Sequence, residues 1–281
     1  MSQMVPLGSI ALYGDVEPIG TITERGPRMD ASTPAVTFDS HGETLLGVLH
    51  LPAGAGPHPV VVVLHGFPGN ERNFDLAQAL RRAGYAALVF HYRGSWGVGG
   101  SWSWRHVLED TAAVVTAVRS GRHPLDADRV ALVGHSLGGF AALMTAAADP
   151  AVAAVVSVAG FDFGVAAAAC RADEHARQAY VDAFDEDLLP LRGTSGAALV
   201  AEMEAAGPAW RLADLAPRLA GRPVLLIGTG RDPVTPAELH HAPLVAAYRT
   251  AEHHVFPTDH ALSDHRLELA RTVIDFLGRN L

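Results

Sequence analysis

Lysine is absent from this chain, and all 21 of its basic residues are arginine. The absence excludes a Schiff-base lysine, a Walker-type phosphate-binding lysine and a serine–lysine catalytic pair. Cysteine is almost absent too: Cys170 stands alone, so no intramolecular disulfide can form and we expect a cytoplasmic protein. The apolar run VAAAAC around it predicts a buried structural cysteine.

Long apolar runs and a basic charge balance are also missing. No run approaches the roughly 20 apolar residues of a membrane span, and the first residues do not read as a signal peptide, so we expect no membrane partner. The net charge of −9 argues against a nucleic-acid partner. Formation of a homodimer stays open. A hydrophobic content of 49% predicts a globular protein.

Strand and helix patterns alternate after an aperiodic start. Residues 1–34, which contain several prolines, predict an extended N-terminal arm. A hairpin over 35–51 and then alternating buried strands and helices predict an α/β protein with a mostly parallel sheet of about eight strands, covered by helices on both faces. The expected helices include 73–85, 106–120, 136–148, 170–184, 195–206, 235–249 and 262–280.

One acidic segment interrupts this alternation. Residues 161–206 hold nine acidic residues against three arginines, a net charge of −6. Their helical pattern predicts a cap inserted into a core formed by 35–160 and 207–281, over the sheet's carboxyl edge.

The stretch GHSLG, residues 134–138, matches the G-x-S-x-G pattern of a nucleophile elbow. It lies between an apolar strand and an amphipathic helix, the context in which a sharp turn lifts the serine clear of the sheet. The nucleophile is therefore predicted to be Ser136. A serine needs a base and an orienting acid, which follow in the order Ser, Asp, His in this kind of fold. Asp232 and His260, each in a loop after a predicted strand, take these roles ahead of Asp259 and His265.

An oxyanion hole is predicted from two backbone amides. One belongs to Leu137, directly after the nucleophile, and the other to Phe67, in the loop after the first long buried strand. Pro68 has no N–H to donate, so the donor must precede it. His65 is expected to pack beneath this loop.

These motifs resemble the α/β-hydrolase superfamily from about residue 35 to the end. HGFPGN, YRGSWGVGG and GHSLGG look like the prolyl-oligopeptidase and dienelactone-hydrolase-like branch of its serine hydrolases. The resemblance implies a triad of Ser136, Asp232 and His260, no cofactor, and a cap made by the insertion. The leucine after Ser136 is the common esterase and lipase form, and no propeller precedes the core, so both features favour a small-substrate esterase over a peptidase.

Cofactor sites find no support in the remaining patterns. The histidines do not form H-E-x-x-H or a Cys/His cluster, so we expect no metal. GSWGVGG lacks the G-x-G-x-x-G spacing, because Trp102 stands where the third glycine should be. The glycine- and tryptophan-rich run of residues 90–106 is called the tryptophan loop. Candidates for the substrate pocket are its Trp96 and Trp102, together with His135. The alternative is that the tryptophan loop is only tightly packed.

The predicted function is a carboxylesterase (EC 3.1.1) that forms an acyl-enzyme on Ser136 with a small, partly apolar substrate. The charge of the insertion favours neutral or cationic acyl substrates over anions. Peptidase, amidase, thioesterase and acyltransferase activities share this machinery. A non-catalytic binding protein that keeps the fold is the alternative from another class.

Overall fold

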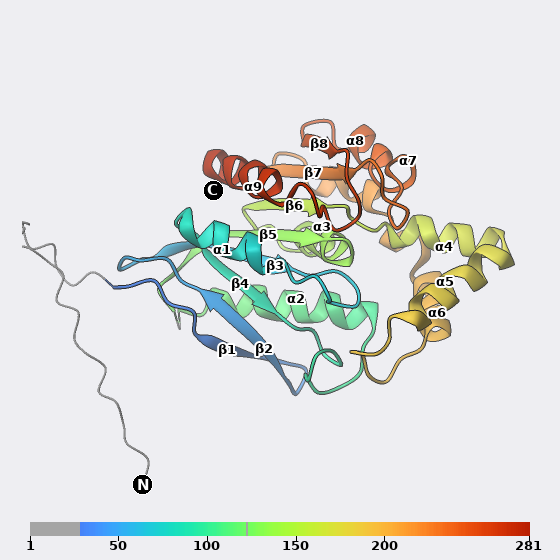
Figure 1. The fold of residues 1–281 in the computed structure, drawn as a ribbon, viewed down its shortest axis with the longest axis horizontal. Helices are drawn as coiled ribbons and strands as arrows, with labels where there is room; N and C mark the ends of the chain where they lie inside the picture. The colour runs from blue at the N-terminus through green and yellow to red at the C-terminus, as the bar shows by residue number, and fades with distance from the viewer. Residues whose placement is uncertain (1–28, 122) are drawn as a thin grey trace, which may run out of the picture.

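The computed structural model describes residues 29–121 and 123–281, so most of the predicted N-terminal arm lies outside the described residues. An eight-stranded sheet crosses the molecule in the order β1-β2-β4-β3-β5-β6-β7-β8 (Figure 1). Only β1 and β2 run antiparallel to their neighbours, and the other adjacent strands pair in parallel, as predicted. The strands are β1 Ala35–Ser40, β2 Glu43–His50, β3 His58–Leu64, β4 Ala86–Phe90, β5 Leu125–His135, β6 Ala154–Val158, β7 Val224–Thr229 and β8 Glu252–Phe256.

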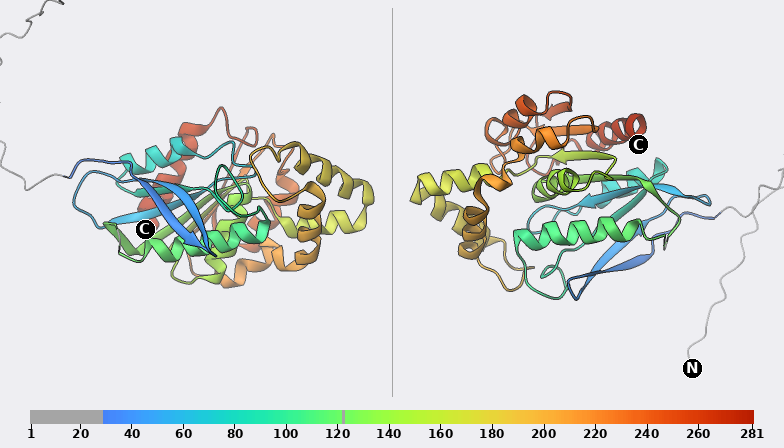
Figure 2. Two further views of the ribbon diagram at one scale, coloured as in Figure 1. Left: turned by 90° about the horizontal axis from the view of Figure 1, so that it is seen from below. Right: turned by 180° about the vertical axis from the view of Figure 1, so that it is seen from behind.

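Helices cover both faces of the sheet, because the central strands are apolar on both sides. Along β3, Val61 and Val63 face one core with α1 (Phe74–Arg82) and α9 (Arg266–Asn280). Val60 and Val62 face the other core with α2 (Trp104–Val118), α3 (Leu137–Ala148) and α8 (Ala242–Ala247). Figure 2 shows α2 and α3 lying in front of the sheet in its right view. The predicted covering of both faces is confirmed.

The acidic segment forms three helices between β6 and β7. They are α4 Phe163–Ala172, α5 Glu174–Glu186 and α6 Gly196–Ala206, followed by the short turns η1 Gly207–Trp210 and η2 Leu212–Arg218. The three helices gather at one end of the sheet (Figure 1). No helix in the described part of the chain is long and apolar enough to cross a membrane.

Three predicted helices differ in their bounds. The helix expected over 170–184 breaks at Asp173, whose side chain caps α5 by accepting a hydrogen bond from the His175 N–H. The helix expected over 235–249 is two short helices, α7 Ala237–His240 and α8, and Pro243 sits in the first turn of α8, where its missing N–H costs nothing. The last helix begins at Arg266 rather than at Leu262, where a φ of 54° is not helical.

The glycine- and tryptophan-rich loop after β4 holds the helical segment in place. Trp96 N–H donates to the Pro190 carbonyl at 3.1 Å, and Trp102 N–H donates to the Arg192 carbonyl at 2.8 Å. The Arg192 N–H donates in return to Gly94, also at 2.8 Å. Gly94 has a φ of +69°, and a Cβ there would collide with the backbone at Trp102, so this close approach requires glycine.

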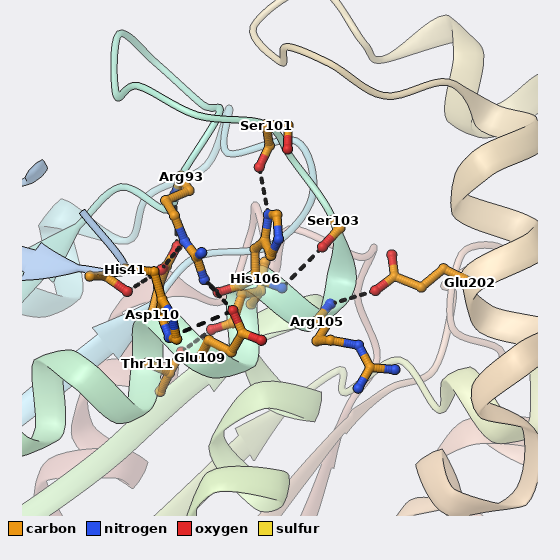
Figure 3. A network of polar contacts seen from close by, with 12 residues as sticks. His41, Arg93, Ser101, Ser103, Arg105, His106, Glu109, Asp110, Thr111 and Glu202 are labelled. Atoms are coloured by element: carbon orange, nitrogen blue, oxygen red, sulfur yellow. Dashed lines mark hydrogen bonds and ion pairs between the residues drawn. The ribbon is translucent and has the colours of Figure 1, made fainter. Parts of the chain in front are cut away.

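A second anchor joins α6 to the start of α2. The Glu202 carboxylate accepts hydrogen bonds from the backbone N–H groups of Trp104 and Arg105, at 3.0 and 2.7 Å (Figure 3 labels Glu202 and Arg105). A carboxylate at a helix N-terminus accepts hydrogen bonds from the unpaired amides and interacts favourably with the positive end of the helix dipole. The Trp104 indole N–H also donates to the Leu199 carbonyl at 3.0 Å. Backbone and side-chain bonds therefore join the segment to the core on two sides.

The tryptophan loop is itself pinned by a buried ion pair. Arg93 Nε lies 2.6 Å from Asp110, which is fully buried on α2, and the Arg93 backbone N–H donates to the same carboxylate at 2.7 Å. Arg93 also reaches Glu109 at 2.6 Å, and Ser40 donates to Asp110 at 2.7 Å. Figure 3 shows Arg93, Glu109 and Asp110 close together beside α2. The loop after β4 is therefore fixed to both α2 and the β1–β2 hairpin.

Candidate active site

Ser136 stands at the turn from β5 to α3, in a strained conformation. Its φ of 57° and ψ of −118° lie where side chains rarely go. The flanking glycines allow the turn: a Cβ on Gly134 would overlap the Gly138 backbone, and a Cβ on Gly138 would overlap the carbonyl of Leu64. The strain is held by the Ser136 N–H, which donates to Val158 on β6 at 2.8 Å. The packing of three strand ends therefore sets the direction of the serine.

Asp232 and His260 meet beside this turn, each in a loop after a strand. His260 Nδ1 lies 2.7 Å from Asp232 Oδ2, and the Asp232 side chain is fully buried. Thr229 and Thr235 donate to the same oxygen at 2.6 and 2.5 Å, and Oδ1 accepts the N–H groups of Val234 and Thr235. Because Nδ1–H points to the carboxylate, the other ring nitrogen of His260 is free to face the cavity.

The hydrogen bonds around Asp232 determine its charge. Burial alone would raise its pKa, but the bond and the charge of His260, with the two threonine hydroxyls, outweigh burial and hold the pKa well below its usual value. Asp232 is therefore a carboxylate at neutral pH. It is placed to orient the imidazole of His260 and to stabilise its protonated form.

His135, next to the serine, lines the pocket and also contacts His260. Its Nε2 lies 2.7 Å from the His260 carbonyl oxygen, and the two ring centroids are 4.8 Å apart. A carbonyl only accepts, so Nε2 carries the proton. Burial lowers the pKa of His135 to about 3, so this histidine stays neutral. It holds the backbone of the loop that carries His260.

The two predicted oxyanion donors line the same cavity as Ser136 and His260. Neither the Phe67 nor the Leu137 amide donates a hydrogen bond to any of the described residues. Leu137 opens α3, so its N–H has no intrahelical partner and lies at the positive end of the helix. Gly66 brings the other loop close, since a Cβ there would lie 3.1 Å from the Ser136 Cβ.

A cavity of about 330 Å³ joins these groups. Aromatic side chains make most of its apolar wall, drawn from the oxyanion loop, α2 and the inserted helices: Phe67, Trp104, Phe161, Phe163 and Phe184. Glu71 and Asp187 add two carboxylates to the lining. The site therefore combines a serine, an imidazole–carboxylate pair and free amides in an aromatic pocket that bears negative charge.

Comparison with known proteins assigns this arrangement to a family. A model of the α/β hydrolase fold family matches residues 59–222, more than half of the chain. The chain belongs to the α/β-hydrolase fold family. The narrower prolyl-oligopeptidase and dienelactone-hydrolase-like branch stays a prediction.

Curated relatives of this α/β-hydrolase match parts of the chain. Hydrolase LUC6 of a Fusarium species is 41% identical over 42% of this chain and 31% of its own length. The quorum-quenching protein AidA of Acinetobacter baumannii is 36% identical over 46% of this chain and 44% of its own length. The chain thus spans less than half the length of these relatives.

Solved structures share the fold of this α/β-hydrolase at low sequence identity. Est1E from Butyrivibrio proteoclasticus, solved with ferulic acid, has a TM-score of 0.69 at 20% identity and covers 88% of this chain and 99% of its own. The Pyrococcus furiosus esterase Pf2001 has a TM-score of 0.65 at 17% identity, covering 89% of this chain and 92% of its own. At these identities the likeness shows the fold.

The tryptophan that lines the α/β-hydrolase pocket is Trp104, which sequence reasoning missed. Trp102 is 2% exposed and packs behind Phe67 and Tyr92, with ring centroids 6.0 and 5.8 Å away, so its placement in the pocket wall is wrong. Trp96 lines a neighbouring cavity and not this one. Trp104 opens α2 at the end of the loop, and the sequence alone does not distinguish it from Trp96 and Trp102, which lie in the same run.

The other histidines of the chain do not join the triad loop. His253 and His254 lie on β8, and His265 precedes α9 and contacts Asp264 at 2.9 Å. His65 is fully buried and packs its ring 4.5 Å from that of Tyr92, beneath the oxyanion loop as predicted. No group of three or more metal-ligating side chains lies together in residues 29–121 and 123–281.

Proposed function

We propose that this protein is a serine hydrolase that cleaves a carboxylic ester through an acyl-enzyme on Ser136. One observation carries the proposal: a strained serine shares a cavity with His260, whose Nδ1 a buried carboxylate holds at 2.7 Å. The order Ser, Asp, His along the chain is that of this fold. The names of the relatives and of the structural neighbours, hydrolases and esterases, support the same class.

The geometry supplies each step of an acyl transfer. His260 takes the Ser136 proton as Oγ attacks the ester carbonyl, and Asp232 stabilises the imidazolium. The amides of Phe67 and Leu137 donate to the oxyanion as it develops. His260 then returns the proton to the leaving alcohol, and water repeats the cycle to release the acid. We assign the helices of 161–206 the role of a cap, since Phe184 on α5 closes the pocket above this chemistry.

The pocket favours a small, partly apolar substrate that is neutral or cationic. Its aromatic wall suits a flat or apolar group, as does the ferulic acid bound by Est1E in that protein. Glu71 and Asp187 in the lining would repel an anion. At low salt we expect a neutral ester to be turned over faster than a matched anionic one, and the reverse order would contradict this preference.

A fluorophosphonate probe tests the nucleophile. The wild-type protein should be labelled and Ser136→Ala should not, and labelling that survives this substitution would refute the serine mechanism. Asp232→Asn should lower kcat by roughly 10⁴-fold, because the acid fixes the imidazole tautomer. The matched control is Asp259→Asn: this exposed neighbour of His260 only accepts the Ser263 N–H, so activity should be retained.

A further inference from the structure

A second cavity opens beside the Ser136 pocket and has no part in the chemistry above. It measures about 460 Å³ and shares three lining residues, Pro68, Asn70 and Asp187, with the first cavity. The two spaces therefore adjoin along the loop that carries the oxyanion donor. At about 330 Å³ the inner cavity is near the lower limit for a ligand site, so a longer substrate needs a second space.

The indole of Trp96 forms a fixed wall of this outer cavity. Its backbone has a φ of 48°, unusual for a bulky side chain. Its N–H donates to the Pro190 carbonyl, and Nε1 donates to the Pro68 carbonyl at 2.8 Å. The Arg72 guanidinium lies 4.0 Å from the ring centroid. Contacts from two loops therefore hold one flat apolar surface beside the outer cavity.

Leu189 supplies an apolar side chain that no packing explains. It lines the outer cavity and is 98% exposed, the most exposed of the large hydrophobic residues described. Its loop is not free: Pro190 accepts the Trp96 amide and Leu191 pairs with Ser95. A single exposed leucine is ordinary. One fixed at the mouth of a cavity next to Trp96 is placed to contact a ligand.

The position of His260 decides which part of a substrate reaches this space. His260 must protonate the leaving alcohol, so the alcohol lies on its side of the pocket, near Val234 and Ala261. The outer cavity has none of these residues and borders Pro68 and Asn70 on the oxyanion loop instead. The acyl chain, which stays on Ser136, therefore points toward the outer cavity.

We propose that the outer cavity is an acyl-chain subsite and that the protein prefers small esters with a medium-length uncharged acyl chain, such as octanoate, over those with the shortest acyl chains. The lining carries the carboxylates of Glu186 and Asp187 against the single guanidinium of Arg192, which disfavours a chain that ends in a carboxylate. Trp96, Leu189 and Pro190 provide the apolar contacts. The assignment rests on the proposed function, since it needs an acyl group on Ser136.

Three esters test the subsite: p-nitrophenyl acetate, p-nitrophenyl octanoate and octyl acetate, the last with the same long chain on the alcohol side. The wild type should prefer octanoate to acetate in kcat/KM. Leu189→Ser should reduce that preference about five- to tenfold by removing apolar contact, with little effect on p-nitrophenyl acetate. The matched control is Leu267→Ser, another exposed leucine, on α9 and outside the lining, which should change nothing.

Two results would overturn the subsite. An unchanged octanoate-to-acetate ratio in Leu189→Ser would show that Leu189 does not contact the acyl chain. A loss of activity confined to octyl acetate would place the alcohol in the outer cavity. A wild type without preference for the longer acyl chain would count equally against it. Failure of the proposed function looks different, because no ester would then be hydrolysed and the probe would not label Ser136.

Discussion

Mild acid should destabilise this protein because it buries neutral histidines. Burial lowers the pKa of His65 and of His135 to about 3, from an ordinary value of 6.5. In the unfolded chain these histidines titrate near the ordinary value. Between pH 3 and 6.5 the unfolded state therefore binds protons that the native state does not bind. Stability from these groups is fully present above pH 6.5 and is lost as the pH falls toward 3. The predicted perturbation is a shift from pH 7.5 to 5.5.

The size of the effect follows from the two pKa values. Over this interval each histidine costs about 1.4 kcal/mol of unfolding free energy, so His65 and His135 together cost about 2.7 kcal/mol. That is a large part of the 5–15 kcal/mol typical of a native protein. The carboxylates of Asp232 and Glu109 do not cancel it. The pKa values of Asp232 and Glu109 lie below their ordinary 3.8 and 4.5, so both groups stay ionised, folded or unfolded, throughout this interval.

Urea unfolding at pH 7.5 and 5.5 measures the loss directly. His135→Gln removes the titration of this histidine while its amide can still donate to the His260 carbonyl, so the loss should shrink by about 1.4 kcal/mol. His175→Gln, at an exposed position on α5, should leave the loss unchanged. Stability that stays constant or rises between pH 7.5 and 5.5 would refute the reasoning, and so would an equal loss in His135→Gln.

Two further predictions concern the contacts that hold the helices of 161–206 and the tryptophan loop. Asp110→Ala should lower the unfolding free energy by about 3–5 kcal/mol, because it leaves the Arg93 guanidinium without its buried partner; a loss below about 1 kcal/mol in urea would contradict a buried ion pair. Glu202→Ala should cost about 1–2 kcal/mol by freeing the Trp104 amide at the start of α2. Glu174→Ala, which removes only an exposed ion pair, should cost less than about 0.5 kcal/mol, and thermal unfolding of the two variants compares them.

Much of the fold could be predicted from local patterns. The apolar runs in β3 and β5 face apolar surroundings on both sides, as expected for strands covered by two layers of helices, and the two cores confirm it. Helix bounds were less predictable. Asp173 ends the expected helix because its side chain caps the next helix, α5. Whether an aspartate caps a helix or lies within one depends on its tertiary surroundings.

The site divides in the same way. Ser136 between Gly134 and Gly138 carries its geometry in the sequence, because any side chain at either flank would overlap backbone. The loops of Asp232 and His260 follow strands, so chain order alone indicates that they share one edge of the sheet. Only the folded structure shows that Asp232 and His260 lie 2.7 Å apart. It also shows the two threonine hydroxyls at Asp232 and the bond from His135 to the His260 carbonyl.

The tryptophan loop shows what could not be predicted from the sequence, namely where each indole points. By itself the sequence determined which residues follow the buried strands: the serine elbow, then the acid, then the base. Each of these depends on neighbours within a few residues. Only the tertiary structure decided that Trp104 faces Ser136, that Trp102 is core and that Trp96 lines a second cavity. The reason is physical: the backbone of Trp96 and Trp102 bonds to Pro190 and Arg192, and the Trp104 indole bonds to Leu199. These partners lie about 90 positions away, so no local pattern contains them.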